Sequence, residues 1–249
     1  MIYLKSEKDI QGIKLAAAIW KKVKAALIQA TKPGVSTKEL DKIAADVIYE
    51  NKATPSFYKY EGFPGYICIS VNEQLIHGIA NEYILRKSDI ITFDIGVTYK
   101  GYVCDAAFSI VLDSNNKEAL DIQKATLECL EEGIKQVIPG NTIGDISYAI
   151  EQTATNHGYQ LIKDFGGHGC GLHVHEDPII LNYGTPHTGV KLRQGMVLCI
   201  EPMLMIDSDE YVIDASNHWT VSSKNKKLTC HEEHMVVVTS NGCEVLTAN

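Results

Sequence analysis

The sequence predicts an α+β fold in which two similar halves, each a pair of helices followed by strands, surround a central metal site. Helical periodicity occurs in two pairs of segments, and a Pro-Gly dipeptide separates the helices of each pair. Each pair precedes an apolar, strand-like run that ends in an acid, Asp94 in the first half and Glu201 in the second. Because both features recur at nearly the same separation, we expect residues 1–249 to form one domain with an internal duplication, roughly 1–110 and 111–249.

Capping residues mark the helix pair of the first half. A helix is predicted over residues 6–30, because Asp9 completes a capping-box pattern and apolar residues follow one face. The dipeptide Pro33-Gly34 ends this helix, and a second helix begins near Ser36, with Glu39 three positions later.

A hairpin follows, because DIGVTYKGYVCD (residues 94–105) alternates like two strands around a tight turn at Lys100-Gly101. With this turn, Asp105 lies opposite Gly96, and Asp94 is its diagonal neighbour on the same face. Diagonal neighbours lie about 7–8 Å apart at the backbone, so the two carboxylates can hold ions about 3.5–4 Å apart. Gly96 is expected to leave room for these ions. A register slip of one residue would separate the two acids.

The second half repeats this order. Helices are predicted over residues 117–137 and 142–157, on either side of Pro139-Gly140. The strand-like segment LRQGMVLCIE (192–201) then parallels LRKSDIITFD (85–94) of the first half. Facing halves would bring acids that are distant in the sequence to one site.

Four acids and one histidine lie in or beside apolar, strand-like runs without a basic neighbour: Asp94, Asp105, His168, Glu201 and Glu233. An ionised carboxylate in such a strand loses on the order of several kcal/mol of hydration unless it is paired or binds a metal. A carboxylate-rich set with one imidazole suits Mn, Fe or Co, often as two ions, whereas structural zinc prefers Cys and His. These residues predict a dinuclear metallohydrolase.

Spacing alone leaves several roles open. In LTCHEEHMVVVT the flanking residues indicate a strand, on which Glu232 and Glu233 face opposite ways, so only one joins the central site. In the glycine-rich DFGGHGCGLHVHEDP, three histidines compete for roles as ligands or catalytic groups, namely His168, His173 and His175.

Other reactive side chains have ordinary structural interpretations. His77 follows CISVNEQLI, where a strand is expected to enter a glycine-containing turn. Cys170 beside His168 allows a nucleophile and base, although packing is the more common role of such a thiol. The seven cysteines are odd in number and never spaced as CxxC, so reduced, mostly buried thiols are expected.

Composition narrows the functional classes. The chain has 249 residues, of which 45% are hydrophobic and 22% charged, as in globular proteins. A net charge of −8 argues against nucleic acid as a partner. The N-terminal segment has charges among its apolar residues, so we expect neither a signal peptide nor a membrane span, and a cytoplasmic location.

Five motifs in order resemble the type I methionine aminopeptidases, short members of the pita-bread (creatinase/aminopeptidase) metallopeptidase family. These motifs are SVNEQLIHGI, the Asp94 to Asp105 spacing, GGHGCGLHVHEDP, GMVLCIEPM and WTVSSKNKKLTCHEEHMVVVT. The resemblance covers nearly the whole chain and implies the pita-bread fold. It also implies that two divalent ions, drawn from Co, Mn, Fe(II), Zn or Ni, bind Asp94, Asp105, His168, Glu201 and Glu233. Asp105 and Glu233 would bridge the ions, which selects Glu233 over Glu232.

The resemblance further implies removal of the N-terminal methionine from nascent proteins and peptides whose second residue is small. A water or hydroxide between the two ions would attack the first peptide bond, with Glu201 handling the proton. His175 would contact the scissile amide, and His77 would help to orient the substrate. The methionine side chain would occupy an apolar slot formed by Phe57, Tyr60, Phe63, Val174 and Trp219.

Two departures from the family pattern define the alternatives. Leu172 is more typical of the related Xaa-Pro peptidases, which makes an Xaa-Pro aminopeptidase or dipeptidase on the same scaffold the nearest rival. Val174 replaces a bulkier residue and would widen the methionine slot. A non-catalytic peptide-binding protein of this fold is the rival from another class. The expected partners are nascent polypeptides near the ribosome, bound by a monomer, without nucleic acid or membrane.

Overall fold

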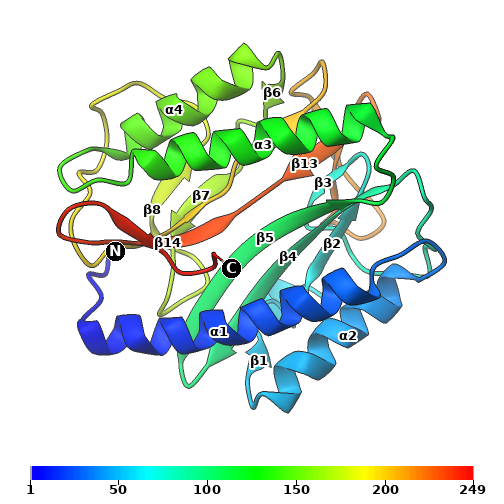
Figure 1. Ribbon diagram of the computed structural model, residues 1–249, viewed down its shortest axis with the longest axis horizontal. Helices are drawn as coiled ribbons and strands as arrows, with labels where there is room; N and C mark the ends of the chain where they lie inside the picture. The colour runs from blue at the N-terminus through cyan, green and yellow to red at the C-terminus, as the bar shows by residue number, and fades with distance from the viewer. Residues whose placement is uncertain (1, 249) are drawn as a thin grey trace.

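The computed structural model describes residues 2–248 as two helix pairs with strands between them. In Figure 1, α1 and α2 lie along one side of the strands, and α3 and α4 lie along the other. The helices are α1 Glu7–Ala30, α2 Thr37–Glu50, α3 Lys117–Lys135 and α4 Ile143–Asn156, with a short 3-10 turn at Tyr60–Gly62. The predicted α+β architecture, with one helix pair and strands in each half, is confirmed.

The strands precede and follow the second helix pair. Those before it are β1 Thr54–Pro55, β2 Cys68–Val71, β3 Gln74–Ile76, β4 Ile90–Tyr99 and β5 Tyr102–Val111. Those after it are β6 Gln160–Leu161, β7 Gly166–Gly169, β8 Glu176–Leu181, β9 Val197–Ile200, β10 Met203–Met205, β11 Tyr211–Ile213, β12 Val221–Ser223, β13 Thr229–His231, β14 His234–Val238 and β15 Cys243–Val245.

Capping boxes fix the starts of α1, α2 and α4. At α1 the Ser6 hydroxyl accepts a bond from the backbone of Asp9, whose carboxylate accepts one from the backbone of Ser6. Ser36 and Glu39 form the same pair of bonds at α2, and Thr142 begins the box at α4. The helices lie close to their predicted bounds, with α3 ending slightly earlier than expected.

The hairpin of β4 and β5 has the predicted register. Tyr99 pairs with Tyr102, which places Lys100-Gly101 at the tip, and Asp105 lies opposite Gly96. Both tip residues have positive φ, 51° and 83°, as two-residue hairpin turns require. A four-stranded sheet forms around this hairpin, in which β4 also pairs with β1 and β2.

The second half is built on a five-stranded sheet in the order β15-β14-β9-β7-β8. β14 contacts β5, so the sheets of the two halves meet beside the long hairpin. Between β2 and β3 the chain turns at Asn72, which has a φ of 57°. The turn divides this segment into two short strands, and the expected strand before His77 is β3, which ends at Ile76 directly before His77 and Gly78.

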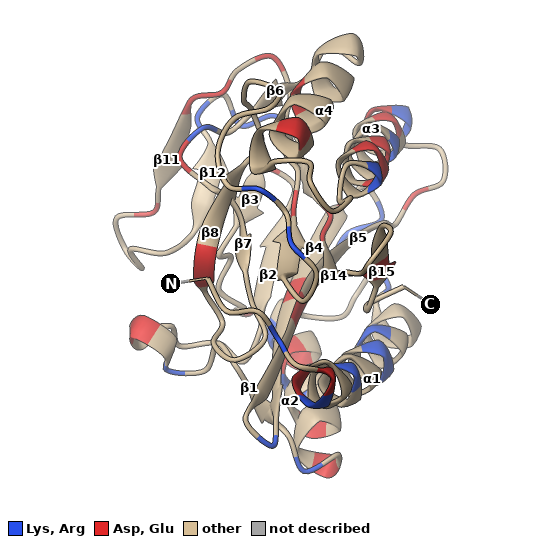
Figure 2. Ribbon diagram, turned by 90° about the vertical axis from the view of Figure 1, so that its left-hand side faces the viewer, with Lys and Arg blue, Asp and Glu red and all other residues tan. Residues whose placement is uncertain are grey.

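Each helix pair packs on its own apolar cluster. In the first, Trp20 of α1 is fully buried against Phe108, and its indole N–H donates to the carbonyl of Ala106 at 3.1 Å. In the second, Ile146 of α4 belongs to the same cluster as Leu198 of β9. Figure 2 shows that charged residues mark the helices and loops far more than the strands, as expected for helices with one solvent-facing side.

The cysteines lie inside this packing. All seven are free thiols, and only Cys243 among them is more than slightly exposed. The prediction of reduced, mostly buried thiols agrees with this arrangement. Within residues 2–248, no helix is long and apolar enough to cross a membrane.

Candidate metal centre

The first half contributes two carboxylates from the long hairpin. Asp94 on β4 and Asp105 on β5 project from the same face, because Asp105 pairs with Gly96 and Asp94 is two residues earlier. The expectation that Gly96 leaves room for ions is wrong. A Cβ at this position would lie 2.7 Å from atoms of both Ser56 and Phe57, so these side chains occupy the space.

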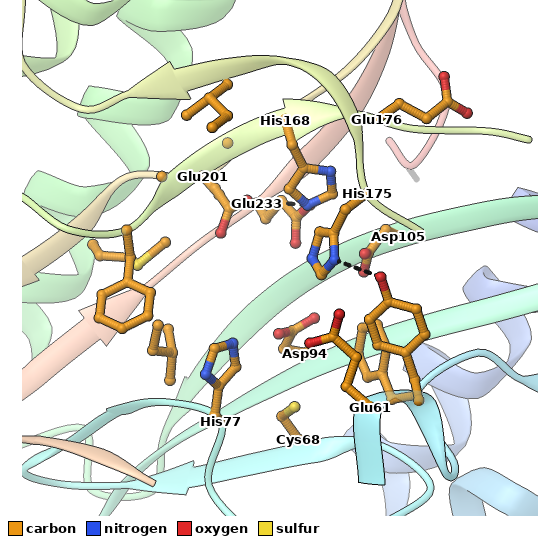
Figure 3. A pocket seen from close by; sticks show the side chains of 18 of the residues that line it. Glu61, Cys68, His77, Asp94, Asp105, His168, His175, Glu176, Glu201 and Glu233 are labelled. Atoms are coloured by element: carbon orange, nitrogen blue, oxygen red, sulfur yellow. Dashed lines mark hydrogen bonds and ion pairs between the residues drawn. The ribbon is translucent and has the colours of Figure 1, made fainter. Parts of the chain in front are cut away.

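The second half contributes three groups from three different elements. His168 lies on β7, Glu201 directly follows β9, and Glu233 lies between β13 and β14. In Figure 3 these side chains and the two hairpin carboxylates point toward one space. The structure thus brings together all five residues that the sequence predicts as ligands.

The ligand atoms are close enough to share ions. One nitrogen or oxygen from each of Asp105, His168 and Glu233 lies within 4.8 Å of the others. The Nε2 atom of His168 is 3.5 Å from Oε1 of Glu201. Its Nδ1 is 2.9 Å from the carbonyl of Gly169, which leaves Nε2 free to coordinate.

The electrostatics of this cluster favour the binding of positive charge. Burial, and then repulsion from Glu201, raises the pKa of Glu233 well above its ordinary value. Burial, followed by repulsion from Glu233, does the same to the pKa of Asp105. The pKa of Asp94 is raised to about 7, mainly by burial. Ionising these buried carboxyl groups together is energetically unfavourable, and cations bound between them would offset that penalty.

Buried carboxylate oxygens without a hydrogen-bond partner indicate whether a metal ion would fit this site. Oδ1 of Asp105 and Oε1 of Glu233 are buried and have no hydrogen-bond partner within the described chain. Both belong to carboxylates that face the shared space (Figure 3). Oxygen-rich sites with one imidazole suit hard or borderline divalent ions, so the donor set fits such a group.

The two adjacent glutamates differ in their surroundings. Glu232 accepts hydrogen bonds from the backbone N–H of Ser109 at 3.1 Å and from Nε2 of Gln123 at 3.3 Å. Glu233 instead lines the cavity that holds the other acids. The expected continuous strand is wrong, because β13 ends before these residues and β14 begins after them. Their opposite orientation nevertheless agrees with the prediction.

Two further histidines border the cluster. The ring of His175 lies 4.5 Å from that of His168, and its Nδ1 is 3.2 Å from the Tyr60 hydroxyl. Partial loss of solvent around the ring, and then His168, lowers the pKa of His175 to about 4. Burial also lowers the pKa of His77, whose ring packs edge-on against Trp219. Both imidazoles are therefore neutral at neutral pH.

His173, the third histidine of the glycine-rich segment, lies in a different environment. His173 lines the cavity, but it is in none of the groups of clustered ligand atoms found among residues 2–248. Its ring lies 6.0 Å from that of Tyr3. Its backbone N–H and that of Leu172 donate to Glu176, which forms a buried ion pair with Lys5. This ion pair fixes the loop that carries His175.

A cavity of about 660 Å³ contains the acids and an apolar slot beside them. Phe57, Tyr60, Phe63 and Trp219 line it, and the rings of Phe63 and Trp219 meet edge to face at 5.3 Å. Val174 is buried but does not line the cavity, unlike the sequence expectation.

Leu172, which supported the rival activity, and Cys170, the candidate nucleophile, are likewise absent from the lining of this cavity. Cys170 is fully buried in the apolar core, in agreement with a packing role.

The sequence predictions missed residues near the centre. Among them is Cys199, whose thiol lies within 4.8 Å of ligand atoms of Asp105, His168 and Glu233. Cys68 pairs with Asp94 across β2 and β4 and lines the cavity. His231 lies within 4.8 Å of ligand atoms of Glu201 and Glu233. The sequence contains one signal for His231, because it stands two positions before Glu233, a spacing that places residues on one face of extended backbone.

Comparisons with known proteins agree with this geometry. The sequence pattern of metallopeptidase family M24 matches residues 11–240. The methionine aminopeptidase of Mycoplasma genitalium is 43% identical over 251 residues, which cover 99% of this chain and 100% of the relative. Methionine aminopeptidase 1 of Bacillus subtilis is 38% identical, with 99% of each chain covered.

Solved structures give the same result. The methionine aminopeptidase from Rickettsia prowazekii superposes with a TM-score of 0.97 at 32% identity, and both chains are covered completely. The prolidase from Pyrococcus furiosus superposes with a TM-score of 0.82 at 25% identity, covering 99% of this chain but 65% of the prolidase. The similarity to the aminopeptidases therefore extends over both whole chains.

Proposed function

Because this chain belongs to metallopeptidase family M24, we propose that its cavity releases the N-terminal methionine from peptides and nascent proteins whose second residue is small. The observation that carries this conclusion is the position of the slot. Aromatic residues line an apolar slot in the same cavity as the five clustered ligand side chains. A flexible thioether packs well against aromatic rings, so a methionine side chain placed there brings the first peptide bond to the acids.

Asp94, Asp105, His168, Glu201 and Glu233 would hold two divalent metal ions. Four carboxylates balance the charge of two such ions, and the unpaired buried oxygens of Asp105 and Glu233 support this assignment. When bound, the ions supply Lewis-acid polarisation of the scissile carbonyl and an activated water. We propose Co, Mn, Fe(II), Zn or Ni as the candidates, because the donor set is hard to borderline.

The residues of the chain provide positioning and proton transfer. Although burial disfavours the charge of Glu201, the imidazoles of His231 and His168 lower the pKa of its carboxyl. Glu201 is therefore ionised and able to accept a proton from the attacking water. The neutral rings of His175 and His77 lie on either side of the cavity (Figure 3), where they can hydrogen-bond the amide and orient the peptide.

The decisive experiment compares two peptides, Met-Ala-Ser and Ala-Pro-Ser, with chelator-stripped protein before and after addition of each candidate ion. We expect metal-dependent release of methionine and no release of alanine. Release of alanine from the proline peptide would instead establish an Xaa-Pro aminopeptidase. Failure to release either residue with any ion would favour a peptide-binding protein.

The proposed release of methionine also indicates where the protein acts. N-terminal methionine is present on chains as they are synthesised, so we propose action on nascent polypeptides in the cytoplasm, near the ribosome. We also propose that the protein acts as a monomer with a single catalytic domain over residues 1–249. The two helix pairs and their matching capping boxes support an internal duplication, roughly 1–110 and 111–249.

A further inference from the structure

His231 lies at the metal centre but outside the five proposed ligands. It is the last residue of β13, where it pairs with Met203 of β10, and only 1% of its surface is exposed. It does not line the cavity. Its ring therefore approaches the acids from the packed side of the centre, away from the space that a substrate enters.

The imidazole of His231 has an incomplete set of polar contacts in the described chain. Nδ1 is buried without a hydrogen-bond partner, and Nε2 is buried beside Oε2 of Glu201, with which it forms an ion pair but no well-aligned hydrogen bond. Buried polar groups are normally paired, and one that is not calls for an explanation such as an ion. Oε1 of Glu233, in the same cluster, is also buried and unpaired.

The geometry around Glu201 supplies that explanation. Nε2 of His231 is 3.4 Å from Oε2 of Glu201, while Nε2 of His168 is 3.5 Å from Oε1 of the same carboxylate. Glu201 thus lies between two imidazoles. One ligand atom from each of Glu201, His231 and Glu233 lies within 4.8 Å of the others. Ligands at about 2.0–2.2 Å from one tetrahedral ion are about 3–3.5 Å apart, close to the measured separation.

We propose that His231 is a sixth ligand of the metal centre and binds, through Nε2, an ion held by Glu201 and Glu233. This inference rests on the proposed function, since it adds a ligand to the same centre. A neutral imidazole preserves the balance between four carboxylates and two divalent ions. A second imidazole also makes the donor set softer, which favours Co, Zn, Ni or Fe(II) over Mn.

The test counts imidazole ligands directly. The full-length protein is labelled with ¹⁵N-histidine, stripped with a chelator and loaded with Co(II). Proton NMR then detects the strongly shifted N–H signal of each imidazole that binds the paramagnetic ion. We expect two such signals, one from Nδ1–H of His168, which donates to the Gly169 carbonyl, and one from the buried Nδ1–H of His231.

Three variants assign the signals. His231→Gln should remove one signal and weaken Co(II) binding in calorimetry by at least about tenfold, the lower bound of effects seen near metal sites. His168→Gln should remove the other signal. His234→Gln is the matched control, because His234 lies in the same segment but its Nδ1 is bonded to the Thr247 hydroxyl at 2.8 Å. This control should keep both signals.

Each outcome has a distinct meaning. One shifted signal, lost only in His168→Gln, would overturn the inference, leave the proposed function intact and make His231 a neighbour of Glu201 without a bond to the ion. No shifted signal would reject His168 as a ligand and with it the proposed centre. The unmodified protein provides the count, so the test also holds if His231→Gln fails to fold.

Discussion

The environment of a side chain, more than its chemical type, separates the proposed ligands from their neighbours. Glu232 and Glu233 are adjacent and both buried, yet Glu232 accepts hydrogen bonds from Ser109 and Gln123, whereas Oε1 of Glu233 has no partner in the described chain. Strand alternation predicted that the two differ, and the family resemblance selected Glu233. The alternation could not identify the partner of each carboxylate, because Ser109 and Gln123 come from elements distant in the sequence.

This difference predicts opposite effects of alanine at the two positions. Glu233→Ala should abolish both metal binding and methionine release, since it removes a carboxylate from the centre. Glu232→Ala should retain metal affinity but lose about 1–3 kcal/mol of unfolding free energy, because it leaves the Ser109 N–H unpaired. Calorimetric titration with Mn(II) and urea unfolding would measure both effects. The reverse ranking of metal affinities would overturn the choice of Glu233.

Asp94 predicts a pH dependence that belongs to the metal-free protein. Its pKa is about 7 in the fold and 3.8 in the unfolded reference, so the folded state holds the proton more tightly. Stability from this group is therefore complete below about pH 4 and is lost as the pH rises toward 7. Thermal unfolding of the metal-free protein should show a smaller decline with pH in Asp94→Asn than in the unmodified chain. Equal slopes would contradict the raised pKa.

At the scale of elements, prediction succeeded where local chemistry determines the structure. Capping boxes located the helix starts, and Lys100-Gly101 set the register that places Asp94 and Asp105 on one face. The turn at Asn72, which contains neither glycine nor proline, was not predicted. Prediction failed at Gly96, because the side chains that fill the space beside it come from another segment.

The capping box of α2 gives a prediction about this local control. Ser36→Ala should lower the free energy of unfolding by about 1 kcal/mol, because the hydroxyl no longer accepts the Glu39 N–H. Lys42→Ala is the control, since it removes only an exposed i,i+4 pair with Asp46, worth about 0.5 kcal/mol or less. Urea unfolding of both variants would test the ranking. Equal losses would show that the cap does not stabilise α2.

At the scale of the whole molecule, the recurrence of the Pro-Gly breaks and strand-ending acids predicted two halves with a shared centre. It could not predict how the second half divides into sheets, because β6–β15 are mostly short and some pairings, such as β6 with β10 and β9 with β14, join distant segments. The proposed ligands could be listed from the sequence, whereas their mutual distances required the packing of β5 against β14.

Because both halves supply proposed ligands, metal removal should destabilise the whole fold. An ion present at 100 times its dissociation constant contributes about 2.7 kcal/mol, which corresponds to a shift of about 5–10 °C in Tm for a protein of this size. Calorimetry with and without chelator would measure the shift. Asp105→Ala should show no such response, and a full response in that variant would place the ion elsewhere.

The order of the proposed ligands along the chain also determines when the metal centre can form during synthesis. Asp94 and Asp105 leave the ribosome early on their hairpin, but Glu233 comes from the link between β13 and β14, after almost every other element. An unfinished chain therefore lacks one of the carboxylates proposed to bridge the ions. The enzyme therefore cannot remove methionine from other nascent proteins until its own translation is nearly complete.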